Sequence, residues 1–517
     1  MEDNFEKLAL NPYMSELCQT TSAIRKMDQI ADEMAEKYGR ESIYNFSLGN
    51  PRVPPPEEYN QIMIETLQDK DFFLPHGYAS NYGDTSAREA IAELFSKLQD
   101  TKISYKNVIL SSGCAGAINI MLRSILSVGD EVIVPSPYFL EYPYYIRNYY
   151  GKTVFCHTKF EDGWQVNKEE FEKCFTAKTR CVIINSPHNP TGIVYSDETI
   201  KMVSEVCEKY MKKYGRTIWI LSDEVYCRML RPGKKPYKIF KFYKYSVITY
   251  SLSKDLSLPG ERIGALIMNP EIQLCERNIH ALSIANEFLA IYPPNRLHMR
   301  ALPKLLKHTS KLELYTECQE IVEETLKKLN IQYIQPEGTF YIFPKIPDGL
   351  DEMTFCKTMV QNFVVVVPGS AFGQCGFYRM SLCLMPETVK KGMEQFEIAY
   401  KKTLEEMGYN KDKKEDKKEG SQTTADDEII FKVQFLTSST KLPSNSPKLK
   451  ELTDVSYYEE GGTYKYTCGQ STDLNAIQQL RRRVSATYKD AFLVAFRNGK
   501  RINTAEAINE YKAKHGN

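Results

Sequence analysis

The chain has 517 residues, of which 42% are hydrophobic and 26% charged, a composition typical of folded globular protein. This length exceeds what one hydrophobic core usually serves, so several domains are expected. A net charge of +1 gives no reason to expect nucleic acid or a membrane surface as a partner, and no apolar run approaches a membrane span.

The 13 cysteines are scattered and form no C-x-x-C pair. Several lie inside apolar runs, where a buried reduced thiol is the favoured state, as for Cys181, Cys207 and Cys383. The acidic start of the chain does not have the pattern of a signal peptide. These features predict a cytoplasmic protein.

The first 290 residues show two patterns in chain order. Residues 1–50 are expected to form an arm and a helix, and from there strand-like apolar runs alternate with amphipathic helical runs. A helix is predicted after Ser196, because Ile200, Val203 and Cys207 recur on one face. Strand-helix alternation predicts an α/β fold with a mostly parallel sheet.

Three of the strand-like runs end in polar residues. The run 181–184 leads to Asn189-Pro190-Thr191-Gly192, the run 218–221 leads to Asp223, and the run around Val247 leads to Lys254. Functional residues gather where the strands of such sheets end. We therefore expect Asn189, Asp223 and Lys254 to lie close together.

Lys254 gives the first indication of chemistry. A lysine beside an apolar strand is costly to desolvate, and the usual reason to place one there is to lower its pKa so that the free amine can form a Schiff base. Ser251, Ser253 and Arg262 would suit a phosphate. A Schiff-base lysine beside a phosphate clamp indicates pyridoxal 5'-phosphate (PLP). Taken alone, the segment 251–262 could also be a solvated loop.

The ordered set NPTG (189–192), D-x-x-Y (223–226), S-x-S-K (251–254) and R-x-G (262–264) resembles the fold-type-I PLP enzymes, specifically the class I/II aminotransferases. The resemblance covers about residues 30–405. It implies a PLP-binding large domain at 51–290 with a mostly parallel central sheet. It also implies a smaller α+β domain built from residues 1–50, with the N-terminal arm, and 291–407.

The resemblance also implies roles at the cofactor ring. Lys254 would carry the cofactor as an aldimine and move a proton from the substrate, and Asp223 would pair with the pyridine nitrogen. Tyr226 and Asn189 would contact the phenolic oxygen, and Phe139 would stack on the ring, with Tyr138 as its local competitor. Asp223 could instead be a helix cap, and Tyr226 a core tyrosine.

Further roles concern the phosphate and the substrate. The phosphate would be held by Ser251, Ser253, Arg262 and the turn Gly113-Cys114-Ala115 at a helix start. Tyr78 matches a tyrosine that reaches the neighbouring subunit's phosphate, which implies a homodimer. Arg379, with Gly49 and Asn189, would bind the substrate carboxylate. No metal site is expected.

This sequence departs from the family pattern in two places. Asp84 follows Tyr82-Gly83 where the family commonly has glycine, and Cys114 stands where glycine or a small hydroxyl residue is frequent. No second arginine around residues 289–296 can be assigned to a substrate side chain, so specificity for dicarboxylates stays open.

The function implied is a ping-pong aminotransferase that moves an amino group from an amino acid to a 2-oxo acid. The alternatives are a PLP-dependent C–S β-lyase, which shares the fold and lysine, and a PLP-binding regulatory or interaction protein. No nucleic acid or membrane partner is expected.

A change of composition separates the last part of the chain. Residues 408–427 are rich in lysine and acidic residues and are expected to form a disordered linker. Residues 428–517 show strand-like runs at 429–435, 464–467 and 491–496, a helix near 474–484 and a turn at Asn498-Gly499. The features FKVQ, YEEGGTYKYT and DAFLVAF resemble the SPOR-like domain of Bacteroidales-type N-acetylmuramoyl-L-alanine amidases. The resemblance implies peptidoglycan or protein binding, and no amidase zinc cluster is present in this segment.

Overall fold

The computed structural model describes residues 10–19, 23–273, 275–291, 293–409, 429–442, 446, 449, 455–460, 463–472, 474–488, 490–497 and 500–515. Most of the predicted linker, the turn at 498–499 and the start of the predicted N-terminal arm lie outside these residues. The chain forms two compact units, 1–410 and 411–517. None of the helices in the described ranges is long and apolar enough to cross a membrane.

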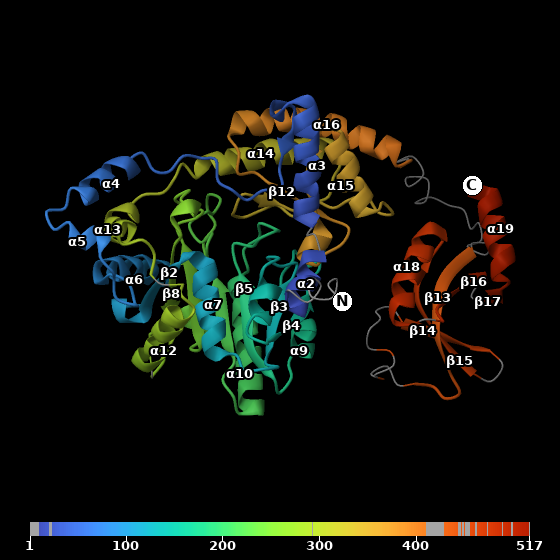
Figure 1. Cartoon of the computed structure of the whole chain (residues 1–517), viewed down its shortest axis with the longest axis horizontal. Coiled ribbons are helices and arrows are strands. Elements are labelled where there is room, and N and C mark those ends of the chain that lie inside the picture. The colour runs from blue at the N-terminus through green and yellow to red at the C-terminus, as the bar shows by residue number, and fades with distance from the viewer. Residues whose placement is uncertain are drawn as a thin grey trace, which may run out of the picture. The chain divides into compact units, whose positions relative to one another are not determined.

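The first unit is built around a seven-stranded sheet (Figure 1). Its strands, in spatial order, are β2 (Val108–Ser112), β8 (Ile263–Met268), β7 (Ser246–Ser251), β6 (Trp219–Asp223), β5 (Thr179–Asn185), β3 (Glu131–Ser136) and β4 (Lys152–His157). β8 runs antiparallel to both of its neighbours, β2 and β7, and the other pairs in the sheet are parallel. The predicted α/β fold with a mostly parallel sheet is confirmed.

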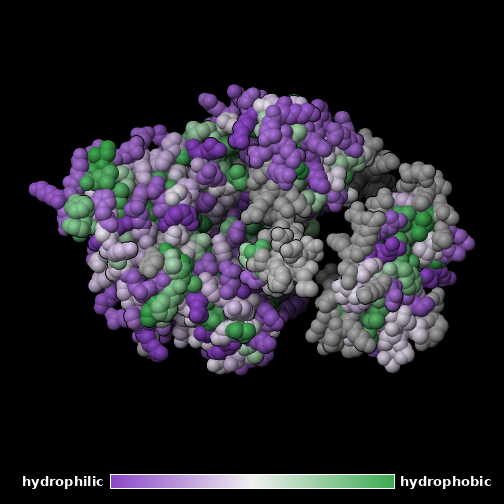
Figure 2. Space-filling view, viewed as in Figure 1, coloured by the Kyte–Doolittle hydropathy of each residue, from purple (hydrophilic) through white to green (hydrophobic). Residues whose placement is uncertain are grey.

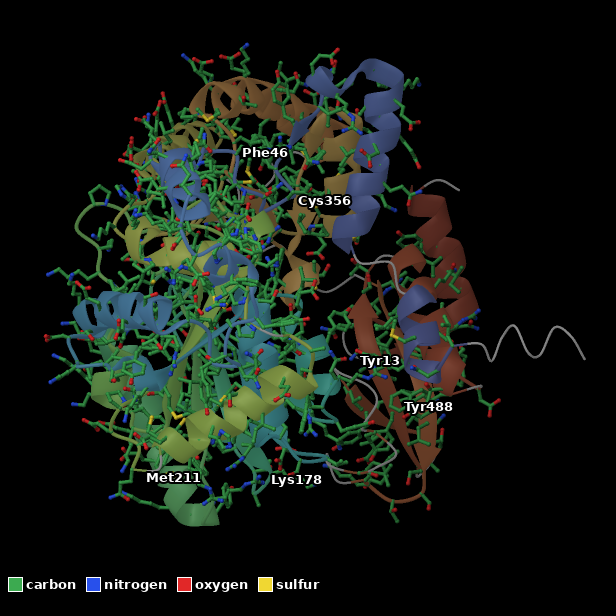
Figure 3. The ribbon with its side chains drawn as sticks, turned by 60° about the vertical axis from the view of Figure 1, so that its left-hand side comes forward. Tyr13, Phe46, Lys178, Met211, Cys356 and Tyr488 are labelled. Carbon is green, nitrogen blue, oxygen red and sulfur yellow. The ribbon has the colours of Figure 1, made fainter. Side chains whose placement is uncertain are left out.

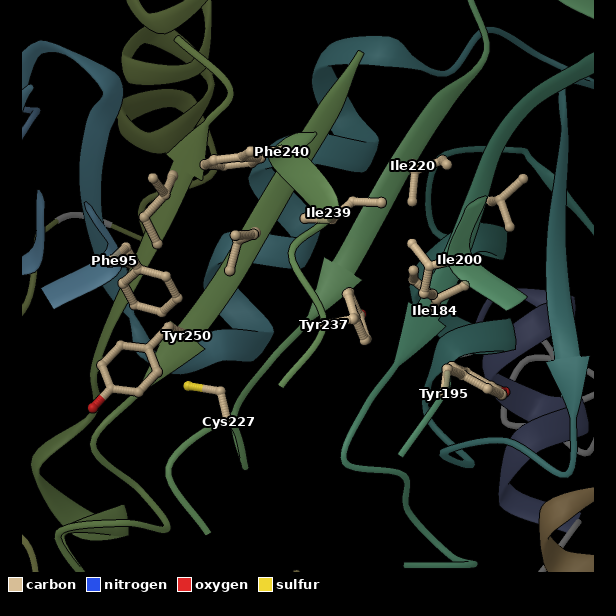
Figure 4. Packing of buried hydrophobic residues seen from close by; sticks show 14 of the residues in the cluster. Phe95, Ile184, Tyr195, Ile200, Ile220, Cys227, Tyr237, Ile239, Phe240 and Tyr250 are labelled. Carbon is tan, nitrogen blue, oxygen red and sulfur yellow. The ribbon is translucent and has the colours of Figure 1, made fainter. Parts of the chain in front are cut away.

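Helices cover both faces of this sheet, which explains why its strands read as continuous apolar runs. One face packs against α6 (Thr85–Gln99), α9 (Lys168–Lys173), α10 (Asp197–Tyr214) and α11 (Ile239–Phe242). The other packs against α7 (Gly113–Ile125), α8 (Tyr142–Arg147) and α12 (Cys275–Phe288). Figure 4 shows the first layer, where the rings of Phe95 and Tyr250 pack together and Ile200 lies beside Ile184 farther along the layer.

The predicted helix after Ser196 is α10. Its first turn is capped because the Ser196 hydroxyl accepts a hydrogen bond from the Thr199 backbone N–H at 3.1 Å. Its end is marked by Gly215, which adopts the left-handed conformation with φ 63°. Local sequence signals therefore set both ends of this helix.

A second core joins the beginning and the end of the first unit. β1 (Tyr44–Asn45) pairs in parallel with β10 (Val364–Val365), and Phe46 packs in one cluster with Cys356 (Figure 3). The other elements of this part are α3 (Ala23–Tyr38), α14 (Glu313–Lys328), β9 (Tyr341–Ile342), α15 (Glu352–Gln361), β11 (Val367–Pro368), β12 (Tyr378–Ser381) and α16 (Pro386–Glu406). The helix α2 (Pro12–Gln19) instead contacts α8, where Arg147 lies over the Tyr13 ring.

Three further helices pack together beside α6. They are α4 (Tyr59–Leu67), α5 (Phe73–His76) and α13 (Arg296–Leu305), and a small apolar cluster of Ile62, Ala301 and Leu305 joins α4 to α13. The helix α13 contacts α6 directly.

The second unit has its own antiparallel sheet and core. Its strand order is β14 (Val455–Glu460), β15 (Thr463–Ser471), β13 (Ile429–Ser438), β16 (Phe492–Arg497) and β17 (Lys500–Ile502). The helices α18 (Leu474–Thr487) and α19 (Thr504–His515) contribute Ile477 and Ala507 to the core beside Phe431 and Val433.

Candidate active site

A cavity of about 530 Å³ lies at the carboxyl ends of β5, β6 and β7. This volume is within the range usual for small-molecule sites. The residues predicted from the sequence that line it are Gly49, Cys114, Ala115, Phe139, Asn189, Asp223, Tyr226, Ser251, Ser253, Lys254, Arg262 and Arg379. Twelve predicted residues, spread along the chain from Gly49 to Arg379, are thus brought together at one edge of the sheet. This agrees with the rule that functional residues of such sheets gather at the carboxyl ends of the strands.

Lys254 follows β7 directly, and its amine donates a hydrogen bond of 2.7 Å to the Gly49 carbonyl oxygen. Burial lowers the pKa of Lys254 to about 8, and the charges of Arg379 and Arg262 act in the same direction. A lysine with this pKa has a substantial fraction of neutral amine near neutral pH. The amine can therefore act as a nucleophile and as a proton carrier.

Asp223 is the last residue of β6 and is fully buried. Its Oδ2 accepts a 2.6 Å hydrogen bond from the Tyr142 hydroxyl, and its Oδ1 accepts one of 3.0 Å from the Cys114 thiol. Burial raises the pKa of Asp223, while these donors, with the Val225 N–H and the Thr249 hydroxyl, act against that rise. An oriented carboxylate in the cavity can bind a protonated ring nitrogen.

Arg262, the residue predicted to bind the phosphate, also lines the cavity. It has a left-handed backbone with φ 54° and donates 2.9 Å from Nη1 to the Pro259 carbonyl oxygen, in the short helical turn Pro259–Glu261. Gly113 does not line the cavity, but a Cβ there would lie 2.5 Å from Arg262 Nη2. Glycine at the start of α7 thus leaves room for the guanidinium.

Arg379 on β12 is buried and held on two sides. Its Nη2 donates 2.6 Å to the Ser47 carbonyl oxygen and its Nη1 donates 3.1 Å to Asn189 Oδ1. Its buried Nε has no hydrogen-bond partner among the residues that the structure describes. Arg379 lines the cavity, where its planar guanidinium suits a planar carboxylate.

Gly49 and Tyr341 form a tight contact beside this arginine. The Arg379 guanidinium carbon lies 4.5 Å from the Tyr341 ring centroid. A Cβ on Gly49 would lie 2.1 Å from the Tyr341 hydroxyl, so any larger residue here would displace Tyr341.

Asn189 and Tyr226, which were predicted to contact the cofactor ring, also line the cavity. The Asn189 backbone N–H donates 2.8 Å to Asn185 Oδ1, and Asn185 in turn donates 2.8 Å to the Asp223 carbonyl oxygen. Burial raises the pKa of Tyr226 well above its ordinary value, so the phenol stays a donor.

The structure distinguishes Phe139 from Tyr138, the other aromatic residue considered for stacking on the cofactor ring. Phe139 lines the cavity, whereas Tyr138 stacks on Phe155 with centroids 4.7 Å apart. Tyr78 lies outside the cavity and is 100% exposed. Arg296 does not line the cavity either, since it pairs with Asp84 and donates to the Tyr78 carbonyl oxygen.

Sequence reasoning missed several residues of this site. They are Tyr142, which bonds Asp223, and the lining residues Ser47, Leu48, Ile118, Leu140, Glu141, Tyr145, Asn185, Val225, Pro259 and Tyr341. Asn185 could have been found, because it ends β5 as Asp223 ends β6. Tyr142 carries no local signal.

Comparison with known proteins agrees with this geometry. The family model described as aminotransferase class I and II matches residues 41–396. A probable aspartate/prephenate aminotransferase of Aquifex aeolicus is 31% identical over 379 residues, which are 71% of this chain and 92% of that protein. The aromatic-amino-acid aminotransferase 2 of Thermococcus litoralis is 30% identical, covering 74% of this chain and 96% of its own length.

Solved structures give the same result. An amino transferase of Eubacterium rectale superposes with a TM-score of 0.73 at 34% identity, covering 76% of this chain and 99% of that one. An aspartate aminotransferase of Thermotoga maritima has a TM-score of 0.67 at 28% identity, with 75% and 99% covered. The chain therefore belongs to the class I and II aminotransferases.

Proposed function

We propose that this aminotransferase binds PLP in the cavity at the strand ends and uses Lys254 to move an amino group from an amino acid to a 2-oxo acid. Members of the family depend on PLP. The observation that carries the proposal is the convergence of Lys254, Asp223, Arg262 and Arg379 on one cavity.

The residues present fit PLP at each of its functional groups. Arg262 with the hydroxyls of Ser251 and Ser253 suits the phosphate, and the start of α7 adds backbone N–H groups. Asp223 suits the pyridine nitrogen, and Phe139 offers a ring for stacking. The 2.5 Å approach that a Cβ at Gly113 would make to Arg262 indicates a space kept for an anion-binding side chain.

Bound PLP supplies an electron sink for the bond broken at the substrate Cα. Lys254 supplies the proton transfer there, because its pKa of about 8 allows the amine both to take and to return a proton near neutral pH. The amino group stays on the enzyme when the donor leaves as its 2-oxo acid, and a second 2-oxo acid then accepts it.

Arg379 binds the α-carboxylate of either substrate. Its contacts with Ser47 and Asn189 hold the guanidinium in one orientation at the cavity wall. The relatives are named for aspartate and for aromatic amino acids, so the donors to test are of both kinds.

We also propose a homodimer in which Tyr78 reaches the partner's phosphate. Exposed apolar rings support this: Phe72 and Phe73 are 63% and 69% exposed and lie in the region of α4 and α5, where apolar surface gathers in Figure 2. Arg296 fixes the backbone of Tyr78 with a 3.1 Å hydrogen bond.

For residues 428–517 we propose a SPOR-like module that binds peptidoglycan or a protein. The antiparallel sheet with two helices packed on one face, and aromatic side chains such as Phe492 at 45% exposure, support a separate binding unit. Retention of the full chain on purified sacculi, and its loss on truncation after residue 410, would support glycan binding. Equal retention of both chains would contradict it.

A cytoplasmic location is proposed from the cysteines, because all those described are free thiols.

Borohydride reduction of the purified full chain, followed by peptide mass mapping, tests the cofactor proposal. The cofactor mass is expected on the peptide that contains Lys254. Labelling of another lysine, or of none, would contradict the assignment. Release of pyruvate and thiol from a cysteine conjugate without amino transfer would instead indicate the β-lyase.

A further inference from the structure

Asp223 is held from two sides by side chains that come from different elements. Tyr142 of α8 donates 2.6 Å to Oδ2, and Cys114 of α7 donates 3.0 Å to Oδ1. The sulfur of Cys114 also lies 3.1 Å from the Thr249 hydroxyl oxygen, and this hydroxyl bonds the carboxylate as well. Both oxygens of the carboxylate are therefore bonded by the chain itself.

Tyr142 makes a second contact that concerns the same site. Its ring packs edge-on against Phe139, with centroids 5.4 Å apart and an interplanar angle of 80°. Tyr142 is 2% exposed and does not line the cavity. It thus touches the two residues assigned to the cofactor ring, the stacking Phe139 and the acid Asp223, without reaching the cavity itself.

Cys114 is an unusual donor at such a place. Burial and the neighbouring Asp223 raise the pKa of its thiol well above the ordinary value, so the sulfur keeps its proton and stays a donor. Its side chain is directed to Asp223.

We infer that Cys114 and Tyr142 are positioning residues that keep the Asp223 carboxylate ionised and fixed in orientation for a protonated ring nitrogen. This inference rests on the proposed binding of PLP. A fully buried carboxylate without donors would take up a proton and lose its charge, and the ring nitrogen would then lose its partner.

Other titratable groups also act on Asp223. They are Tyr145 of α8, Glu224 and Tyr226 after β6, and Tyr237, while Lys254, Arg262 and Arg379 line the same cavity. Glu224 has a pKa raised to about 8 by burial. These groups are present in the wild type and in each variant below. The ratio of the variant's PLP dissociation constant to that of the wild type therefore reports the effect of removing Cys114 or Tyr142 as a donor.

The test is the dissociation constant of PLP, measured by fluorescence titration of the cofactor-stripped full chain between pH 5.5 and 8.5. Cys114→Ala and Tyr142→Phe each remove one hydrogen bond to a charged group, so binding should be about tenfold weaker than wild type at pH 5.5. The gap should close to about twofold at pH 8.5, because the carboxylate is ionised again. Cys114→Ser keeps a donor and should stay near wild type.

Tyr243→Phe is the matched control, because this buried tyrosine donates an equally short 2.6 Å bond, to the Ile218 carbonyl oxygen, and does not line the cavity. The ratio of its PLP dissociation constant to that of the wild type should not change with pH. Ratios for Cys114→Ala and Tyr142→Phe that are flat with pH, or equal to that of Tyr243→Phe, would overturn the inference. A wild-type chain that binds no PLP would overturn the proposed function, and this inference with it.

Discussion

At the scale of single residues, the site depends on charges held in a buried place. Lys254 is nearly enclosed, beside two arginines, and the Phe340 ring lies 5.4 Å from its amine. The cost of desolvation is what lowers its pKa, and this lowered pKa is what makes the lysine useful. Function and stability are therefore opposed at this residue.

This opposition predicts a pH-dependent gain in stability for Lys254→Met in the cofactor-free protein. The unfolded chain binds a proton at Lys254 up to its ordinary pKa, whereas the folded chain releases it above about 8. Stability therefore rises with pH between these two values, and the penalty of the lysine is greatest below about pH 8. The shift corresponds to a penalty on the order of 3 kcal/mol.

Calorimetric Tm values of the cofactor-free proteins check this prediction. Lys254→Met should melt at a higher temperature than wild type at pH 7, and the difference should shrink toward pH 10. A variant that is less stable at pH 7 would show that the hydrogen bond from Lys254 to Gly49 outweighs the cost of burial.

At the scale of elements, the turn from β2 into α7 shapes the phosphate end. Gly113 has φ 69°, its N–H donates 2.9 Å to the Arg262 carbonyl oxygen, and its Cα hydrogen faces the guanidinium. The same residue thus fixes the backbone of Arg262 and makes room for its side chain.

Gly113→Ala should weaken PLP binding by about tenfold or more, because the new Cβ displaces Arg262 and a charge-assisted contact with the phosphate is lost. Gly129→Ala is the matched control, since Gly129 has φ 81° and open space around it. Both variants should lose about 1–2 kcal/mol of stability through backbone strain, but only Gly113→Ala should change the dissociation constant. Equal affinities in the two variants would contradict this account of the turn.

Elements with strong local patterns could be predicted, and those defined by tertiary contacts could not. The buried strands β5, β6 and β7 and the helix α10 were predicted because apolar runs and spacing mark them. The antiparallel direction of β8 was not, because no residue of Ile263–Met268 encodes which way the neighbouring strand runs. The strands β14 and β17 and the helix α19 of the second unit were also missed.

The same distinction holds within the site. Asn189, Asp223 and Lys254 were expected together because each follows a strand, and the structure brings them around one cavity. Tyr142 lies 81 residues from Asp223 in the chain, so only the folded structure shows their contact. The roles assigned to these residues stay predictions.

At the scale of the whole molecule, the proposed dimer makes each site depend on both chains. Tyr78 is fully exposed in one chain, whereas the phosphate residues of that chain lie in its cavity. If Tyr78 serves the partner, a mixed dimer of Lys254→Ala and Tyr78→Ala chains contains one intact site, because the Lys254→Ala chain donates its Tyr78 to the other chain's lysine.

Mixing the two variants after dissociation should therefore raise the rate above that expected from the two variants alone, by up to a quarter of the wild-type rate for random pairing of equal amounts. The rate of amino transfer in the mixture checks this, with each variant alone as control. No recovery in a mixture shown by size and mass to contain mixed dimers would contradict the shared site.

The most direct test of the central claim is the absorbance spectrum of the PLP-loaded full chain, with a panel of aspartate, aromatic and other amino acids and no acceptor. At least one amino acid should convert the visible band of the bound cofactor to the near-ultraviolet band of pyridoxamine phosphate, and a 2-oxo acid should restore it. Lys254→Ala should abolish the conversion. A cofactor band that no amino acid changes, or that changes equally in Lys254→Ala, would contradict the assignment of amino transfer to this site.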